Sequence, residues 1–271
     1  MDKRYSSRKQ HRRAHFLTSL AALACIVALP QTLPAVSFTH SEVLEIGKKI
    51  WRNECNGTVA GLTSWNEGEK FASLGIGHFI WYPKGVDGPF EESFPKLVGF
   101  LRSKGADVPG WLKADMDCPW DTKAEFQRDF RSARMNELRD MLASTVPIQS
   151  EFLAIRMRNA LPKMLEGAKA GERDRVKTNF ERLAATGLGT FALIDYVNFK
   201  GEGTNPAERY KGEGWGLLQV LANMSEGGSP AKAFAESASE ILTRRVENAP
   251  PARNEQRWLP GWKNRVRAYA G

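Results

Sequence analysis

The chain has few of the residues that build metal and redox sites. It contains three cysteines and four histidines in 271 residues, and neither a Cys-x-x-Cys pair nor a Cys/His cluster occurs among them, which argues against a structural metal site. We therefore expect no metal and no cofactor. Internal repeats and low-complexity tracts are also lacking, and the 14 Phe and 8 Trp are typical of a chain with a real hydrophobic core.

A long hydrophobic run is missing as well. The apolar stretch at residues 16–29 has 14 positions, too short to span roughly 30 Å of hydrocarbon comfortably. It follows a basic segment that ends at Arg13, and it precedes Pro30, Pro34 and a small-x-small site at Ala35-Val36-Ser37. These parts predict a secretory signal over residues 1–37, and hence a periplasmic or secreted protein with no stable membrane anchor after cleavage. An uncleaved anchor is the alternative, and the export route stays open.

Positive charge is concentrated in that signal. The formal net charge is +8, of which +5 lies in residues 1–37, where six basic residues stand against Asp2: Lys3, Arg4, Arg8, Lys9, Arg12 and Arg13. The rest of the chain carries only +3, so we expect no nucleic-acid partner. Removal of the signal leaves Cys55 and Cys118, which in an oxidising compartment are more often paired than free. We expect a disulfide between them, worth about 3–4 kcal/mol.

The mature chain begins with a well-marked helix. Thr39-His40-Ser41-Glu42 has capping-box spacing, and apolar residues then recur at helical intervals through Ile46 and Ile50. Glu54 continues this apolar face, and Gly57 ends the helix. A carboxylate that is partly desolvated at the C-terminal end of a helix is favoured in its protonated form.

Further along, the pattern changes twice. Residues 57–82 alternate glycines with aromatic and branched residues, which predicts a small β-hairpin or sheet. Residues 83–121 are rich in Pro and Gly, with one helix near 93–104. From about 122 the chain is predicted to be helical, with stretches near 147–167, 172–186, 190–200, 215–224, 230–247 and 258–269. We therefore expect an α+β, mainly α domain over 38–271, in which a cleft separates the part at 38–121 from a helical lobe at 122–271.

Glu54 is suited to glycosidic-bond cleavage. That reaction needs a protonated carboxylic acid beside the leaving oxygen, and it usually needs a second carboxylate that stays ionised. Glu67 and Glu69, in a Gly-rich polar loop, are candidates for the second role.

The segment from Glu54 to His78 resembles the catalytic region of phage-type lysozymes. In that family, a Glu at the end of the first helix is followed by an Asp, five residues, and a Thr that leads into Gly-Ile-Gly-His. Ser73-Leu74-Gly75-Ile76-Gly77-His78 matches that pattern with Ser73 in the Thr place, and counting back gives Glu67 in the Asp place. The interval from Glu54 to Glu67 is about four residues longer than in the family, which keeps Glu69 open as the second carboxylate. Ala192-Leu193-Ile194-Asp195-Tyr196-Val197-Asn198-Phe199 and the segment at 258–265 are similar to later helices of that fold.

The resemblance implies a lysozyme-like fold and cleavage of the β-1,4 bond between N-acetylmuramic acid and N-acetylglucosamine in peptidoglycan, by a monomer. Glu54 would be the general acid, and Glu67 and Ser73 would hold a water. The residues that would contact substrate are His78, Trp65, Tyr196 and Asn198. For each of these four, a structural role in the core or in a buried hydrogen bond is the alternative. A lytic transglycosylase, a chitosanase-like enzyme and a non-catalytic wall-binding module remain rival hypotheses.

Overall fold

The computed structural model describes residues 39–88 and 90–271. The chain divides into two units, Met1–Ala35 and Val36–Gly271, and the predicted signal over 1–37 lies outside the described residues. The described part is mainly helical with a small antiparallel sheet, which confirms the α+β, mainly α class. Among these residues, no helix is both long enough and apolar enough to cross a membrane.

The first helix, α1 (His40–Cys55), begins as its sequence predicts. The Thr39 hydroxyl accepts a hydrogen bond from the Glu42 backbone N–H, and the Glu42 carboxylate accepts one from the Thr39 N–H at 2.9 Å. The helix ends where Asn56 adopts a left-handed conformation, with φ of 52°. Ile46 and Ile50 are buried on one face, so Glu54 lies on that same face, one residue before the helix ends.

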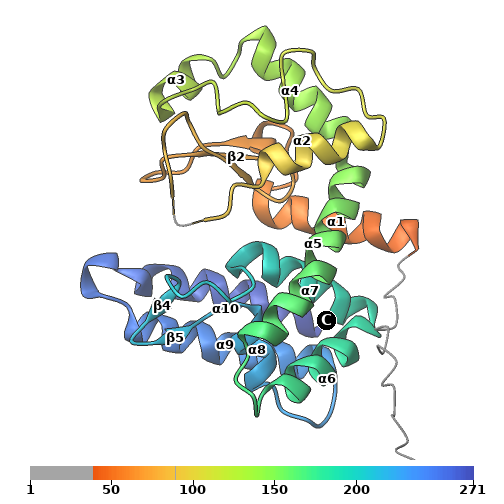
Figure 1. Cartoon of the computed structure of the whole chain (residues 1–271), viewed down its shortest axis with the longest axis vertical. Helices are drawn as coiled ribbons and strands as arrows, with labels where there is room; N and C mark the ends of the chain where they lie inside the picture. Colours follow the sequence, from red (N-terminus) through yellow and green to blue (C-terminus); the bar gives the residue numbers. More distant parts are fainter. Residues whose placement is uncertain (1–38, 89) are drawn as a thin grey trace, which may run out of the picture. The chain divides into compact units, whose positions relative to one another are not determined.

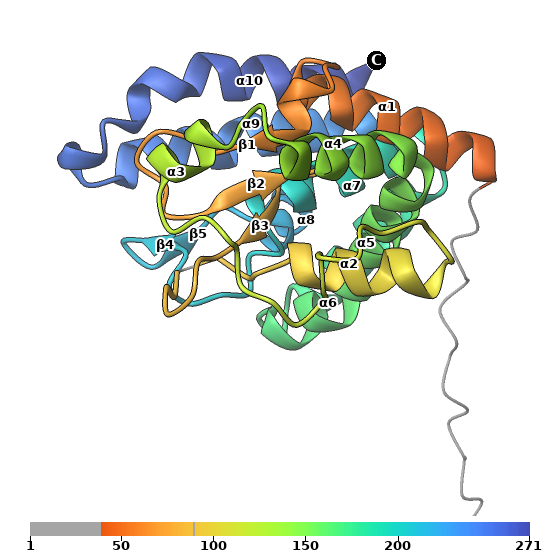
Figure 2. The same ribbon diagram turned by 90° about the horizontal axis from the view of Figure 1, so that it is seen from above.

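A three-stranded antiparallel sheet follows, in the order β1 (Thr63–Ser64), β2 (Ala72–Leu74) and β3 (Phe79–Trp81) (Figure 2). A short 3₁₀ turn, η1 (Ala60–Leu62), connects α1 to β1. In the register, Ser73 of β2 lies opposite both Ser64 and Ile80. Since side chains alternate along a strand, these three residues share one face of the sheet, and the buried apolar residues of β2 and β3 share the other.

The two cysteines correct one prediction. Cys55 and Cys118 are separate buried thiols in this structure, and the expected disulfide is not formed. The Cys55 thiol at the end of α1 donates to the Gly75 carbonyl oxygen at 3.5 Å, whereas the Cys118 backbone N–H binds the Tyr82 carbonyl oxygen at 2.9 Å. Burial raises the pKa of each thiol to about 12, so neither is a reactive thiolate at neutral pH.

Helices account for most of the remaining chain, and their positions agree closely with the predicted stretches. One difference lies near residue 130, where the helical region predicted from 122 onward is interrupted. A new helix begins there, and the Ser132 hydroxyl caps it by accepting a hydrogen bond from the Met135 N–H. The helices are α2 (Phe94–Ser103), α3 (Lys123–Arg128), α4 (Ala133–Ser144), α5 (Val146–Gly167), α6 (Arg173–Ala184), α7 (Gly187–Lys200), α8 (Leu217–Asn223), α9 (Pro230–Asn248) and α10 (Leu259–Arg267). A two-stranded hairpin, β4 (Arg209–Tyr210) and β5 (Glu213–Gly214), was not predicted.

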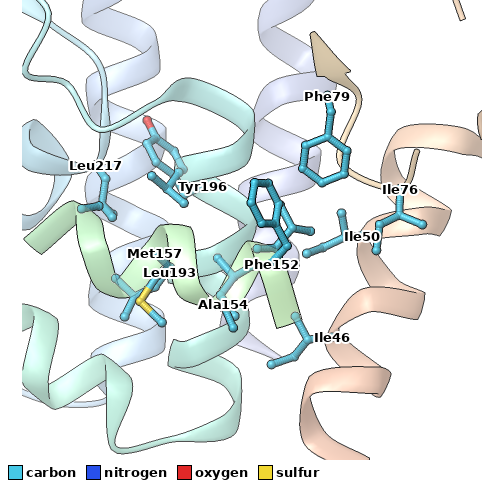
Figure 3. Close-up of a cluster of buried hydrophobic side chains, with 14 of the residues drawn as sticks. Ile46, Ile50, Ile76, Phe79, Phe152, Ala154, Met157, Leu193, Tyr196 and Leu217 are labelled. Atoms are coloured by element: carbon cyan, nitrogen blue, oxygen red, sulfur yellow. The ribbon is translucent and has the colours of Figure 1, made fainter. Parts of the chain in front are cut away.

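Helix α5 connects the sheet region to the later helices (Figure 1). It packs against α1, α2 and α4 and also against α6 and α7. Figure 3 shows Phe152 of α5 beside Phe79 of β3 and Ile50 of α1, and the two Phe rings lie 5.5 Å apart edge to face. Gly47 allows α1 to approach α5 closely, because a Cβ at that position would overlap the Ser150 hydroxyl. This packing sets the position of the C-terminal end of α1, and with it the position of Glu54.

Candidate active site

Three elements from distant parts of the chain meet at the Glu54 carboxylate. Its side chain is only 14% exposed. Arg265 of α10 donates from Nη2 to Glu54 Oε1 at 2.6 Å, and Asn198 of α7 donates from Nδ2 to the same oxygen at 3.3 Å. The His78 Nδ1 atom lies 3.7 Å from the other carboxylate oxygen, Oε2. The expected apolar surrounding of Glu54 is therefore replaced by a polar one.

A second carboxylate fixes Arg265 from the opposite side. Asp195 of α7 is fully buried, and it accepts hydrogen bonds from Arg265 Nε and Nη2, both at 2.8 Å. The Tyr269 hydroxyl donates to Asp195 Oδ2 at 2.5 Å, and Asn53 Nδ2 donates to Oδ1 at 3.4 Å. These donors satisfy the buried charge of Asp195 and leave the Arg265 guanidinium little freedom to rotate.

The network also shifts the ionisation of its members. Burial raises the pKa of Tyr269 well above its ordinary value, and the neighbouring Asp195 carboxylate raises it further. For Arg265, burial lowers the pKa, but the carboxylates of Asp195 and Glu54 more than offset that effect, so the net shift is upward. Tyr269 is therefore a neutral hydrogen-bond donor and Arg265 a permanent cation.

Residues 75–78 form the turn between β2 and β3, and the turn places His78 beside Glu54. Gly75 has φ of 69° and His78 has φ of 48°. The turn closes through a bond from the His78 N–H to the Gly75 carbonyl at 3.2 Å, and it is held to α5 because the Ile76 N–H donates to Gln149 Oε1 at 2.9 Å. Burial lowers the pKa of His78, although the Glu54 carboxylate acts in the opposite direction. The imidazole is thus favoured in its neutral form.

The glycine at position 75 is required by two separate features. Its positive φ disfavours any other residue, and a Cβ there would lie 2.5 Å from Gln149 Oε1. We expect Gly75→Ala to lower the free energy of unfolding by about 1–3 kcal/mol more than Gly85→Ala does. Gly85 is the matched control, because it has φ of 70° but a Cβ there would meet only open space. Urea unfolding of both variants measures the difference, and equal losses would contradict the close contact with α5.

The predicted second carboxylate lies in a different environment. The Glu67 side chain is 93% exposed in the loop between β1 and β2, and it forms an ion pair with Lys123 at the start of α3. The hydrogen bond and positive charge of Lys123 lower the pKa of Glu67. Glu69 accepts a bond from Asn66 at 3.0 Å, and burial raises its pKa. In the part of the chain that the structure describes, no hydrogen bond or ion pair joins either residue to Glu54.

The other predicted residues divide into two groups. Asn198 and His78 both lie against Glu54, as described above. Trp65 is 7% exposed, and its indole nitrogen donates to the Glu69 carbonyl oxygen at 2.8 Å. Tyr196 is fully buried, and its hydroxyl donates to the Trp215 carbonyl oxygen at 2.9 Å. Ser73 is 3% exposed, in the middle of β2. Trp65 and Tyr196 are therefore buried and hydrogen-bonded, as expected for the alternative in which they have a structural role instead of contacting substrate.

Arg265, Asp195 and Tyr269 were not among the predicted site residues. One signal for Asp195 was present, because it interrupts the apolar run at 191–197, and a carboxylate buried there requires partners. Its partner Arg265 is 70 residues away, and no local pattern connects the two positions.

Comparisons with protein-family models, curated proteins and solved structures found no significant match. Within residues 39–88 and 90–271, no group of three or more His, Cys, Asp or Glu side chains could hold a metal ion. Two surface hollows are lined by other residues than Glu54, one on α9 and α10 and the other around residues 82–92. The chemistry of this site is therefore inferred from the Glu54 environment itself.

Proposed function

We propose that the protein is an exported glycosidase of lysozyme-like fold that cleaves peptidoglycan at the β-1,4 bond between N-acetylmuramic acid and N-acetylglucosamine, with Glu54 as the general acid. One observation carries the proposal: a largely buried carboxylate at the end of α1 is faced by Arg265, by Asn198 and by His78 of the Gly75–His78 turn. The likeness of this turn to the Gly-Ile-Gly-His of phage-type lysozymes supplies the substrate class.

The accessibility of Glu54 supports its role as the reacting carboxylate. Arg265 supplies a single positive charge to two carboxylates, Glu54 and Asp195. Asp195 accepts bonds from Arg265, Tyr269 and Asn53 and is fully buried. Glu54 is the more accessible of the two, with 14% of its side chain exposed, so it is the carboxylate that a leaving oxygen could reach.

Two outcomes of bond cleavage remain open at this site. In hydrolysis, an ionised carboxylate such as Glu67 would orient the attacking water, with Ser73 helping to hold it. A lytic transglycosylase needs no water, since an internal sugar hydroxyl attacks instead and a single Glu suffices. The ion pair of Glu67 with Lys123 favours this second candidate, because it engages the Glu67 carboxylate elsewhere.

The mass of the products separates the two reactions. We expect the purified protein to release fragments from isolated peptidoglycan whose masses include one added water per cleaved bond. Mass spectrometry of the soluble fragments measures this, and chitosan oligomers digested in parallel test for a chitosanase. Fragments lighter by one water would show that the enzyme is a lytic transglycosylase and not a hydrolase. Binding to peptidoglycan without release of any fragment would contradict the enzymatic assignment and support a wall-binding module.

A further inference from the structure

An exposed aromatic surface lies at the start of α10. Trp258 is 40% exposed, which makes it one of the few large apolar side chains of the described residues that face solvent. Its ring stacks on that of Trp262, one helical turn further on, with centroids 6.0 Å apart and planes inclined by 30°. The Arg257 guanidinium also lies over the Trp258 ring, and part of the indole stays exposed to solvent.

A continuous series of contacts joins this surface to Glu54. The Trp262 ring meets the Phe199 ring edge to face, with centroids 6.4 Å apart. The Arg265 guanidinium lies 4.1 Å from the Phe199 ring centroid, and the same guanidinium binds Glu54. Trp258, Trp262 and Arg265 are at helical spacing along one face. The exposed indole is thus at the outer end of the row of side chains whose inner end is Glu54.

The inner part of this row packs against two basic side chains, Lys200 and Arg245. The Lys200 Nζ atom lies 3.6 Å from the Trp262 ring centroid, and the Arg245 guanidinium lies 4.9 Å from it. Arg245 is itself fixed by buried Glu255, at 2.7 Å between Nε and Oε2. A ring fixed in this way gives Trp258 a rigid support, so little side-chain entropy is lost when a ligand stacks on it.

The outer part of the row carries positive charge. The Arg257 guanidinium lies 4.5 Å from the Trp258 ring centroid, and within the described residues it forms no ion pair. Arg253, which is exposed nearby in sequence, forms an ion pair with buried Glu255 at 3.8 Å, and Glu255 also binds Arg245. This charge is complementary to a ligand that bears carboxylates.

We propose that Trp258 and Arg257 form a subsite for a distal sugar unit of a carboxylate-bearing amino-sugar polymer. The apolar face of a sugar ring packs on the exposed part of the indole beside Arg257, and a carboxylate of the glycan or of its attached peptide pairs with the Arg257 guanidinium. This rests on the proposed function, because it places a further unit of the same strand beyond the bond cleaved at Glu54.

Binding measured without turnover tests the subsite. In the Glu54→Gln background, soluble peptidoglycan fragments of several disaccharide units are titrated by calorimetry. We expect Trp258→Ala to weaken binding about tenfold, and Trp258→Phe to weaken it less, since an aromatic face is kept. Leu188→Ala is the matched control, because Leu188 is also 40% exposed but lies at the start of α7. It should leave the affinity unchanged.

Neutral chitin oligosaccharides of equal length isolate the role of charge. Arg257→Gln should weaken the fragments that bear carboxylates about threefold to tenfold and leave the neutral oligosaccharides nearly unaffected. Equal losses for both ligands would overturn the assignment of Arg257 as the carboxylate contact.

The outcomes for Trp258 and for the proposed function are separable. If the Glu54→Gln protein binds fragments and Trp258→Ala binds them equally well, the subsite is wrong while the glycosidase proposal stands. If Trp258→Ala weakens binding but the unaltered protein releases no fragments, the subsite holds and the glycosidase proposal fails. No binding of either ligand at millimolar concentration, with the fold intact by circular dichroism, would overturn the subsite.

Discussion

Glu54→Gln should reduce the release of fragments from peptidoglycan by about a thousandfold, because general acid catalysis contributes factors of this size. The amide is nearly the same shape as the carboxylate and can still accept a bond from Arg265, so the fold should be kept. It cannot deliver a proton to the leaving oxygen. A reducing-sugar assay on purified cell walls, with the product masses checked, measures the loss.

Two controls make this result specific. Glu69→Gln alters a carboxylate with no contact to Glu54, and it should change the rate only slightly unless Glu69 is the second carboxylate. Glu67→Gln should cost a large part of the rate in a hydrolase and almost none in a lytic transglycosylase. If the Glu54→Gln protein releases fragments at the unaltered rate, the assignment of the acid is wrong, whatever the other variants show.

Arg265→Met should lower the free energy of unfolding by about 3–5 kcal/mol, because the change leaves the buried Asp195 carboxylate without its counter-ion. Methionine keeps most of the apolar stem and removes the guanidinium. Chemical denaturation followed by far-UV circular dichroism measures the change. The same variant should lose activity, since Glu54 would no longer be held at its present position.

A second substitution distinguishes loss of charge pairing from loss of packing. Adding Asp195→Asn to Arg265→Met removes the uncompensated charge, and it should restore part of the lost stability. Arg257→Met is the control for a guanidinium that is exposed and unpaired, and it should cost less than about 0.5 kcal/mol. If the double variant is no more stable than Arg265→Met, the loss of stability does not come from an uncompensated charge on Asp195.

Local patterns predicted the helices and the small sheet well. The Thr39 capping box and the spacing of Ile46 and Ile50 act within one or two turns of helix, so their effect is readable in the sequence. The same spacing placed Glu54 on the inner face of α1. The turn at Gly75 was also readable, because a glycine of this kind marks close approach of the backbone to another element.

Long-range pairing could not be predicted in the same way. The contact of Glu54 with Arg265 spans 211 residues, and the partners of Asp195 come from both α1 and the segment after α10. The same is true of Cys55 and Cys118. An oxidising compartment favours disulfide formation, but the sequence does not give the distance between the two thiols. The ion pair of Glu67 with Lys123 likewise depends on how the loop after β1 meets α3.

The span between Glu54 and Arg265 also has a kinetic meaning. Their contact joins the first described helix to α10, so it requires both ends of the described chain to be docked. Contacts between residues far apart in sequence form more slowly than local ones, because the chain between them must first be closed into a loop. A partly folded chain in which α10 is undocked would possess its sheet and most of its helices but lack the counter-ion of the candidate acid. Catalytic competence would then be the last property gained during folding and the first lost as the structure loosens.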